Sequence, residues 1–160
     1  GVKMFVVIRE WGEYSDHGAR CICICNSNED AEKAIDLLKK VDQFSISESK
    51  KLKSAIKEYE SLLGIKPYPP PPKKSIIDPK NIISQNDWFK YYIEPHKKLY
   101  TEVYDYNFRL QNKINQFAKD WKYTIPDKLM KFKDEIDVSI YSDYRSEYTY
   151  SIEEIPVISF

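Results

Sequence analysis

Four side chains near the N-terminus are of the types that bind divalent metals or exchange protons. They cluster around a stretch with glycine at both ends, and they are Glu10, Glu13, Asp16 and His17. Carboxylates and an imidazole are common metal ligands and general acid–base groups. A polar turn between two strands has the same composition, and nothing in the spacing fixes the geometry of these groups. We therefore predict no catalytic residue, no metal ligand and no cofactor, and keep a metal-dependent enzyme built on this loop as the third hypothesis.

The three cysteines, Cys21, Cys23 and Cys25, occupy alternate positions in one run. On a strand their thiols would point to one face, about 7 Å apart. Zinc sites hold their ligands closer together, and neither a Cys-x-x-Cys pair nor a neighbouring histidine is present. The pattern predicts small buried side chains on the core face of a strand, and the odd count favours a reducing compartment.

Lysines and aromatic residues are interleaved in the second half of the chain. Ten of them are candidate partner-binding residues: Trp88, Lys90, Tyr91, Lys97, Lys98, Tyr100, Tyr104, Lys119, Lys122 and Tyr123. Lysines can neutralise phosphates while aromatic rings stack on unpaired bases, as in proteins that bind RNA or single-stranded DNA. Large aromatic side chains with a charged rim are also favoured in protein interfaces.

The charge is unevenly distributed, although the whole chain has a net charge of zero. Residues 66–133 carry fourteen basic and seven acidic side chains, a net of +7, and residues 134–160 carry one basic and seven acidic side chains, a net of −6. Either the basic segment faces a nucleic acid, or the two segments compensate each other or form a charged protein-binding surface. The second interpretation is favoured, because many of the aromatic residues also have core spacing.

The elements that must position these residues begin with a hairpin. Apolar, β-branched residues predict strands at Lys3–Trp11 and 19–25, joined by a polar loop. A helix is expected to start at Ser27 and a second at Ser45, each with a carboxylate three residues later. Gly64 suits a left-handed helix stop. Residues 1–65 are thus a hairpin followed by two helices.

The middle of the chain reads as a helical insertion. Consecutive prolines make 66–83 an extended linker, and 84–134 the insertion itself. Apolar residues recur every three to four positions from Leu99 to Trp121, which predicts one helix of about 27 residues. Pro126 is expected to start a shorter helix that carries Leu129.

The period changes to two in the segment 135–160. Ile136, Val138 and Ile140 alternate with polar residues, and the run 148–153 alternates again, which predicts a second hairpin. Neither hairpin could bury its apolar face alone. We therefore predict a single α+β domain over 1–160, with an antiparallel sheet of about four strands from both chain ends, helices on one face and the long helical insertion.

Some of these elements resemble small uncharacterised bacterial and phage domains. The resemblance rests on the first hairpin, on a helix that opens with Ser27-x-x-Asp30 and Ala31-x-x-Ala34-Ile35, and on the closing strand 150–155. It covers about the first 40 and the last 15 residues. It implies no function, and no functional family is identified.

The leading functional hypothesis is a non-enzymatic macromolecule-binding protein with a protein partner. A composition rich in Lys, Ile, Tyr and Asn suggests a bacterial or phage source, and hence a mobile-element regulator or an inhibitor of a host nucleic-acid enzyme, such as an anti-CRISPR. The alternative is an RNA- or single-strand-binding module. No apolar run reaches the roughly 18 residues of a membrane span and no signal peptide is visible, so we expect a cytoplasmic protein with no membrane partner.

Overall fold

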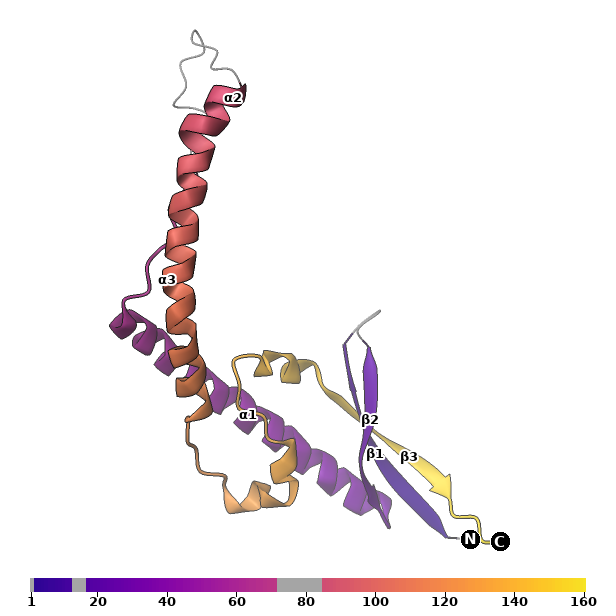
Figure 1. The fold of residues 1–160 in the computed structure, drawn as a ribbon. Helices are drawn as coiled ribbons and strands as arrows, with labels where there is room; N and C mark the ends of the chain where they lie inside the picture. The colour runs from indigo at the N-terminus through magenta and orange to yellow at the C-terminus, as the bar shows by residue number, and fades with distance from the viewer. Residues whose placement is uncertain (1, 13–16, 72–84) are drawn as a thin grey trace. The chain divides into compact units, whose positions relative to one another are not determined.

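The computed structural model describes residues 2–12, 17–71 and 85–160 (Figure 1). The chain divides into two compact units. Unit 1 is Gly1–Ala55 with Trp121–Phe160, and unit 2 is Ile56–Asp120. Helix α1 (Asn28–Leu63) begins in unit 1 and ends in unit 2.

Unit 1 contains one antiparallel sheet of three strands in the order β2-β1-β3 (Figure 1). The strands are β1 (Lys3–Trp11), β2 (Gly18–Cys25) and β3 (Thr149–Pro156). The first hairpin and the pairing of the two chain ends are as predicted, since Lys3 lies opposite Pro156 and Glu10 opposite Thr149. The α+β class is confirmed, with three strands rather than the expected four.

The missing strand is the first half of the predicted second hairpin. Residues 136–139 do not join the sheet; they run along α1, where the Asp137 amide donates to Ser45 Oγ (3.1 Å) and the Ser139 amide to Ser49 Oγ (3.0 Å). Residues four apart on a helix rise about 6.0 Å, and residues two apart on an extended chain rise about 6.6 Å. The two periods match closely enough for alternate amides to reach successive serines. The alternation of period two therefore does mark an extended segment, but this segment is hydrogen-bonded to a helix and not to a strand.

The core of unit 1 lies between the sheet and α1. Val7 of β1 and Ala31 and Leu38 of α1 are fully buried, and Phe132 packs against them. Phe132 comes from the 3₁₀ helix η4 (Asp127–Glu135), which starts directly after Pro126 as predicted and buries Leu129. A second 3₁₀ helix, η5 (Ser142–Glu147), precedes β3.

The cysteine run does not place three thiols on one face, as the alternation predicted. Cys23 lies opposite Val7, but Cys21 lies opposite Ile8, so Ile22 is an extra residue in a β-bulge. The bulge reverses the alternation. Cys23 and Cys25 stay on the core face, whereas Cys21 is exposed.

Helix α1 is continuous, where two helices were predicted. Its start agrees with the sequence analysis, because Ser27 Oγ accepts the Asp30 amide at 3.1 Å. The apparent second start at Ser45 is no helix cap, since that hydroxyl binds the Asp137 amide instead. No glycine or proline occurs between Asn28 and Leu63 to interrupt the helix.

Gly64 ends the helix as predicted. Its φ is +72°, and the Ile65 amide donates to the Glu60 carbonyl while the Gly64 amide donates to Ser61. This pair of bonds is the Schellman motif, which needs a residue without a Cβ at the left-handed position.

In unit 2 the helical run consists of α2 (Gln85–Trp88), the π-helical turn η3 (Phe89–Ile93) and α3 (Glu94–Lys119). Pro95 has no N–H group and its ring would crowd the preceding turn, and the wider π turn directly before it relieves both problems. Accordingly, the Glu94 amide donates to the Phe89 carbonyl. The predicted long helix is confirmed by the 26 residues of α3. Among the described helices, none is long and apolar enough to cross a membrane.

Candidate functional site

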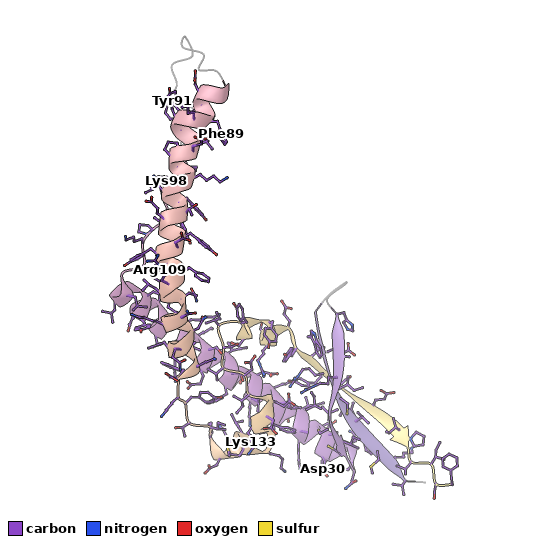
Figure 2. All side chains as sticks on the ribbon, viewed as in Figure 1. Asp30, Phe89, Tyr91, Lys98, Arg109 and Lys133 are labelled. Carbon is purple, nitrogen blue, oxygen red and sulfur yellow. The ribbon has the colours of Figure 1, made fainter. Side chains whose placement is uncertain are left out.

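A short stretch of unit 2 exposes an unusual number of large apolar side chains. Seven of them are between 37% and 62% exposed, and we call this set the aromatic face. Tyr100, Tyr104 and Phe108 lie in one row on α3, and the others, Phe89, Tyr91, Tyr92 and Leu99, project at other angles along the same run. Phe89 and Tyr91 lie near the start of this helical run, as Figure 2 shows. Single exposed apolar residues are ordinary, but a concentration of them on one short helical run is typical of an interaction site.

Several of these rings are held in place by a neighbour four residues away. Trp88 stacks on Tyr92 with ring centroids 4.9 Å apart, and Tyr104 stacks on Phe108 at 6.1 Å. Residues at this spacing lie one above the other on a helix. Stacked rings lose less conformational entropy when a partner binds, so they suit a contact surface.

Helix α3 is supported by the extended chain that follows α1. Asn107 accepts the Lys66 amide (2.9 Å) and donates to the Lys66 carbonyl (2.8 Å). Tyr68 stacks on Tyr100 with centroids 4.6 Å apart. The described part of the predicted linker, 66–71, therefore belongs to unit 2 and lies against α3, while 72–83 are outside the described residues.

A shallow groove runs beside the Tyr104–Phe108 stack. Its volume is about 260 Å³, and Tyr68, Tyr104 and Phe108 contribute its aromatic walls. Glu60 and Gln111 also line it and offer polar atoms. A groove with aromatic walls and a few polar groups has the composition of a side-chain-binding pocket in a protein interface.

Seven of the ten predicted partner-binding residues are distributed along one helical run of unit 2. These seven lie along the α2–α3 run: Trp88, Lys90, Tyr91, Lys97, Lys98, Tyr100 and Tyr104. Lys119 is in the same unit but about 22 Å further along the helix from Tyr104, at 1.5 Å per residue. Lys122 and Tyr123 are in unit 1, where the Tyr123 ring packs near Phe44 with centroids 6.1 Å apart.

Sequence reasoning left out four members of the aromatic face: Phe89, Tyr92, Leu99 and Phe108. Leu99 was assigned to the buried stripe of the helix, yet it is 49% exposed. The signal was present in the sequence, because the aromatic residues of this segment are too many for one helical stripe. Some of them had to face outward.

The charges on the α2–α3 run are mixed rather than basic. Residues 85–120 carry six basic and five acidic side chains, a net of +1. Most of the basic excess of 66–133 lies elsewhere: Lys73, Lys74 and Lys80 fall outside the described residues, and Lys122, Lys128, Lys131 and Lys133 belong to unit 1.

The acidic C-terminal segment is partly compensated within unit 1. Glu135 pairs with Arg9 (2.9 Å) and Arg20 (2.5 Å), and Glu154 pairs with Lys3 (2.7 Å). The partners in these pairs come from the first hairpin and not from the predicted basic helices.

Unit 1 also contains a buried polar cluster that the sequence analysis missed. Asp42 of α1 accepts a hydrogen bond from Arg145 (3.0 Å) and one from the Tyr150 hydroxyl (2.5 Å). Arg9 Nε donates to the same hydroxyl at 3.3 Å, and its other nitrogen reaches Glu135. Arg9, Asp42 and Arg145 are at most 6% exposed. Buried charges must be paired, and here Asp42 pairs with Arg145 while Arg9 pairs with Glu135.

The environment of the cluster shifts the ionisation of its members. Burial, and then the hydrogen bond to Asp42, raise the pKa of Tyr150 above its ordinary value. Burial also raises the pKa of Asp42, although the Tyr150 hydroxyl and Arg145 oppose this shift. The sequence did contain a signal, because Arg9 continues the core-facing alternation of Phe5 and Val7.

The loop considered for metal binding is described only in part. Glu10 and His17 approach to 3.4 Å at the surface, while Glu13 and Asp16 lie outside the described residues. In the described part of the chain, no three His, Cys, Asp or Glu side chains are grouped to hold a metal ion.

Comparisons with protein-family models, with curated proteins and with solved structures find no match to this chain.

Proposed function

We propose that this chain is a non-enzymatic protein-binding module and that the aromatic face of α2–α3 contacts its partner. The observation that carries the proposal is the stacked, exposed pair Tyr104 and Phe108, 49% and 61% exposed, beside an aromatic groove. Interfaces concentrate their binding energy in a few aromatic side chains that enter pockets on the partner.

The charge pattern favours a protein partner over a nucleic acid. A surface that binds single strands carries an excess of cations, because each phosphate contact replaces a counterion. On the α2–α3 run, Lys97 and Lys98 are flanked by Glu94 and Glu102, and the net charge of 85–120 is only +1. Charges of both signs attract a polyanion only weakly, but they can pair with the mixed rim of a protein interface.

The polar side chains between the rings complete this surface. Lys97 and Thr101 precede Tyr104 by seven and three residues, so they lie on the same side of α3 and are exposed. They provide a polar rim next to the apolar centre. In protein interfaces, such a polar rim excludes water from the apolar residues that are buried at the centre.

The test is a comparative capture with three proteins. Wild-type chain, the double variant Tyr104→Ser/Phe108→Ser and the control Tyr141→Ser are immobilised in parallel and exposed to extract from the source cells. Tyr141 is 74% exposed in unit 1, so the control removes an equally accessible ring elsewhere. We expect a protein that wild type and the control retain and that the double variant loses at least tenfold, followed by direct titration of that protein.

Two results would contradict the proposal. Equal retention by the double variant would show that the aromatic face is not the contact surface. Capture that disappears after nuclease treatment, with a steep dependence of binding on log salt, would show a nucleic-acid ligand instead.

A further inference from the structure

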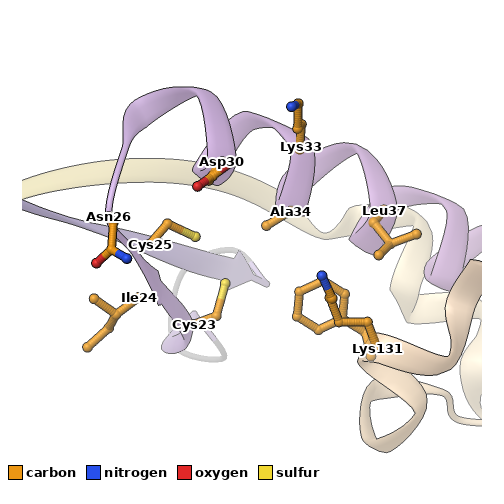
Figure 3. Close-up of a pocket in the computed structure, with 10 residues that line it drawn as sticks. Cys23, Ile24, Cys25, Asn26, Asp30, Lys33, Ala34, Leu37 and Lys131 are labelled. Atoms are coloured by element: carbon orange, nitrogen blue, oxygen red, sulfur yellow. The ribbon is translucent and has the colours of Figure 1, made fainter.

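A pocket in unit 1 lies between the end of β2, the start of α1 and η4. Its volume is about 500 Å³, and Ala34, Leu37 and Phe132 give it apolar walls. Two thiols, those of Cys23 and Cys25, line it together with Lys131. Figure 3 shows both sulfur atoms and the Lys131 ammonium group pointing into this space, whereas Lys33 points away from it.

The β-bulge at Ile22 determines which thiols face the pocket. Cys23 and Cys25 lie opposite Val7 and Phe5 on the core face of the sheet. Because of the bulge, Cys21 is on the opposite face of the sheet, where it is exposed. Its Sγ donates to the Cys23 carbonyl at 3.8 Å. The pocket therefore contains a pair of thiols and not a triplet, and the two lie close enough to hydrogen-bond to each other, nearer than the spacing expected on a regular strand.

A pair of thiols without a third ligand restricts the chemistry. Zinc takes four ligands and hard cations take six or more oxygen ligands, and the described residues group no three such side chains. Soft sulfur ligands select Cu⁺ over these ions. We propose that Cys23 and Cys25 bind one monovalent soft cation, Cu⁺ or its analogue Ag⁺, as a two-coordinate dithiolate in this pocket.

The step is a ligand exchange without a change of oxidation state. Each S–H bond breaks, each sulfur forms a bond to the cation, and two protons go to solvent, so the bound complex carries a charge of −1. Lys131 lies in the pocket and compensates that charge, and the positive end of the α1 dipole is nearby, while the Asp30 carboxylate on the same lining acts in the opposite direction.

The charged and titratable groups around the pair are Asp30 and Lys33 of α1, Lys131 of η4 and Cys21 of β2. Binding displaces the protons of both thiols, so the affinity for the cation should rise with pH.

The test uses Cu⁺ held by a coloured competing chelator under anaerobic conditions. We expect the wild type to withdraw one equivalent of Cu⁺, and Cys21→Ser, the matched control on the same strand, to do the same. Cys23→Ser and Cys25→Ser should bind at least about 100-fold more weakly, with circular dichroism confirming that each remains folded.

Wild type and Cys21→Ser keep the proposal testable even if Cys23→Ser or Cys25→Ser fails to fold. No withdrawal of Cu⁺ by wild type, loss of binding in Cys21→Ser, or an affinity that does not change between pH 6 and pH 8 would each overturn it. So would full binding by a folded Cys23→Ser variant.

Discussion

The two units place their side chains in opposite ways. In unit 1, polar groups are inside: Arg9, Asp42, Ser45, Ser49 and Arg145 are buried, and each bonds to another part of that unit. In unit 2, large apolar groups are outside, along the α2–α3 run. Buried polar groups that satisfy one another specify one fold. Exposed rings contribute little to the fold that presents them, so they suit contact with another molecule.

The largest expected effect comes from removing a buried charge in unit 1. Arg9→Met keeps the apolar stem but leaves the Tyr150 hydroxyl and Glu135 without this partner. Removing one member of a buried ion pair costs about 3–5 kcal/mol, and we expect about 3 because Arg20 still pairs with Glu135. Hydrogen exchange should show the loss of protection in the amides of β1 and β3.

The matched control is Arg109→Met, an exposed arginine on α3, labelled in Figure 2. A surface substitution of this kind changes stability by at most about 0.5 kcal/mol. If Arg9→Met and Arg109→Met caused equal losses of hydrogen-exchange protection in their own units, the buried polar groups of unit 1 would not be more important for stability than exposed groups of unit 2.

A smaller effect is expected where α1 binds the extended segment. Ser45→Ala leaves the partly buried Asp137 amide without its acceptor, which costs about 1–3 kcal/mol. The control is Ser47→Ala, at an exposed serine of the same helix. Both variants gain the same helix propensity, so the difference between them does not contain that contribution. The two variants are compared by urea denaturation monitored by near-ultraviolet circular dichroism. Equal denaturation midpoints would argue that the hydrogen bonds from 137 and 139 to the serines of α1 do not stabilise the fold.

The smallest effect concerns alkaline pH. The pKa of Tyr150 is raised above 10, so the unfolded chain loses this proton before the folded chain does. The stability from its neutral hydroxyl is complete below pH 10 and declines as the pH rises further, by at most about 1.4 kcal/mol per unit. We expect Tyr150→Phe to show a shallower decline than wild type between pH 9 and pH 11 in urea denaturation.

The sequence allowed the local features to be predicted and missed those that depend on distant partners. The Ser27 cap, the Gly64 stop and the 26-residue helix each follow from a signal contained within a few turns of chain. The extended segment 136–139 carries the period of a strand, and only the fold shows that its hydrogen-bond partner is a helix.

The same limit applied to the sites. Alternation placed three thiols on one face, because a single extra residue at Ile22 leaves no mark in the sequence. The sequence shows correctly that basic and acidic residues are segregated along the chain. It does not show which charges pair, because Arg9 and Arg20 lie more than a hundred residues from their partner Glu135.

The pairing of β1 with β3 has a consequence during synthesis of the chain. Between the two segments of unit 1 lie the residues of unit 2, Ile56–Asp120. At about 5–20 residues per second, their translation takes several seconds. During that time one edge of β1 has no β3 to pair with, and the backbone N–H and C=O groups on that side lack their partners. Unpaired strand edges promote association between chains, so the nascent protein passes through an interval in which shielding by chaperones matters most.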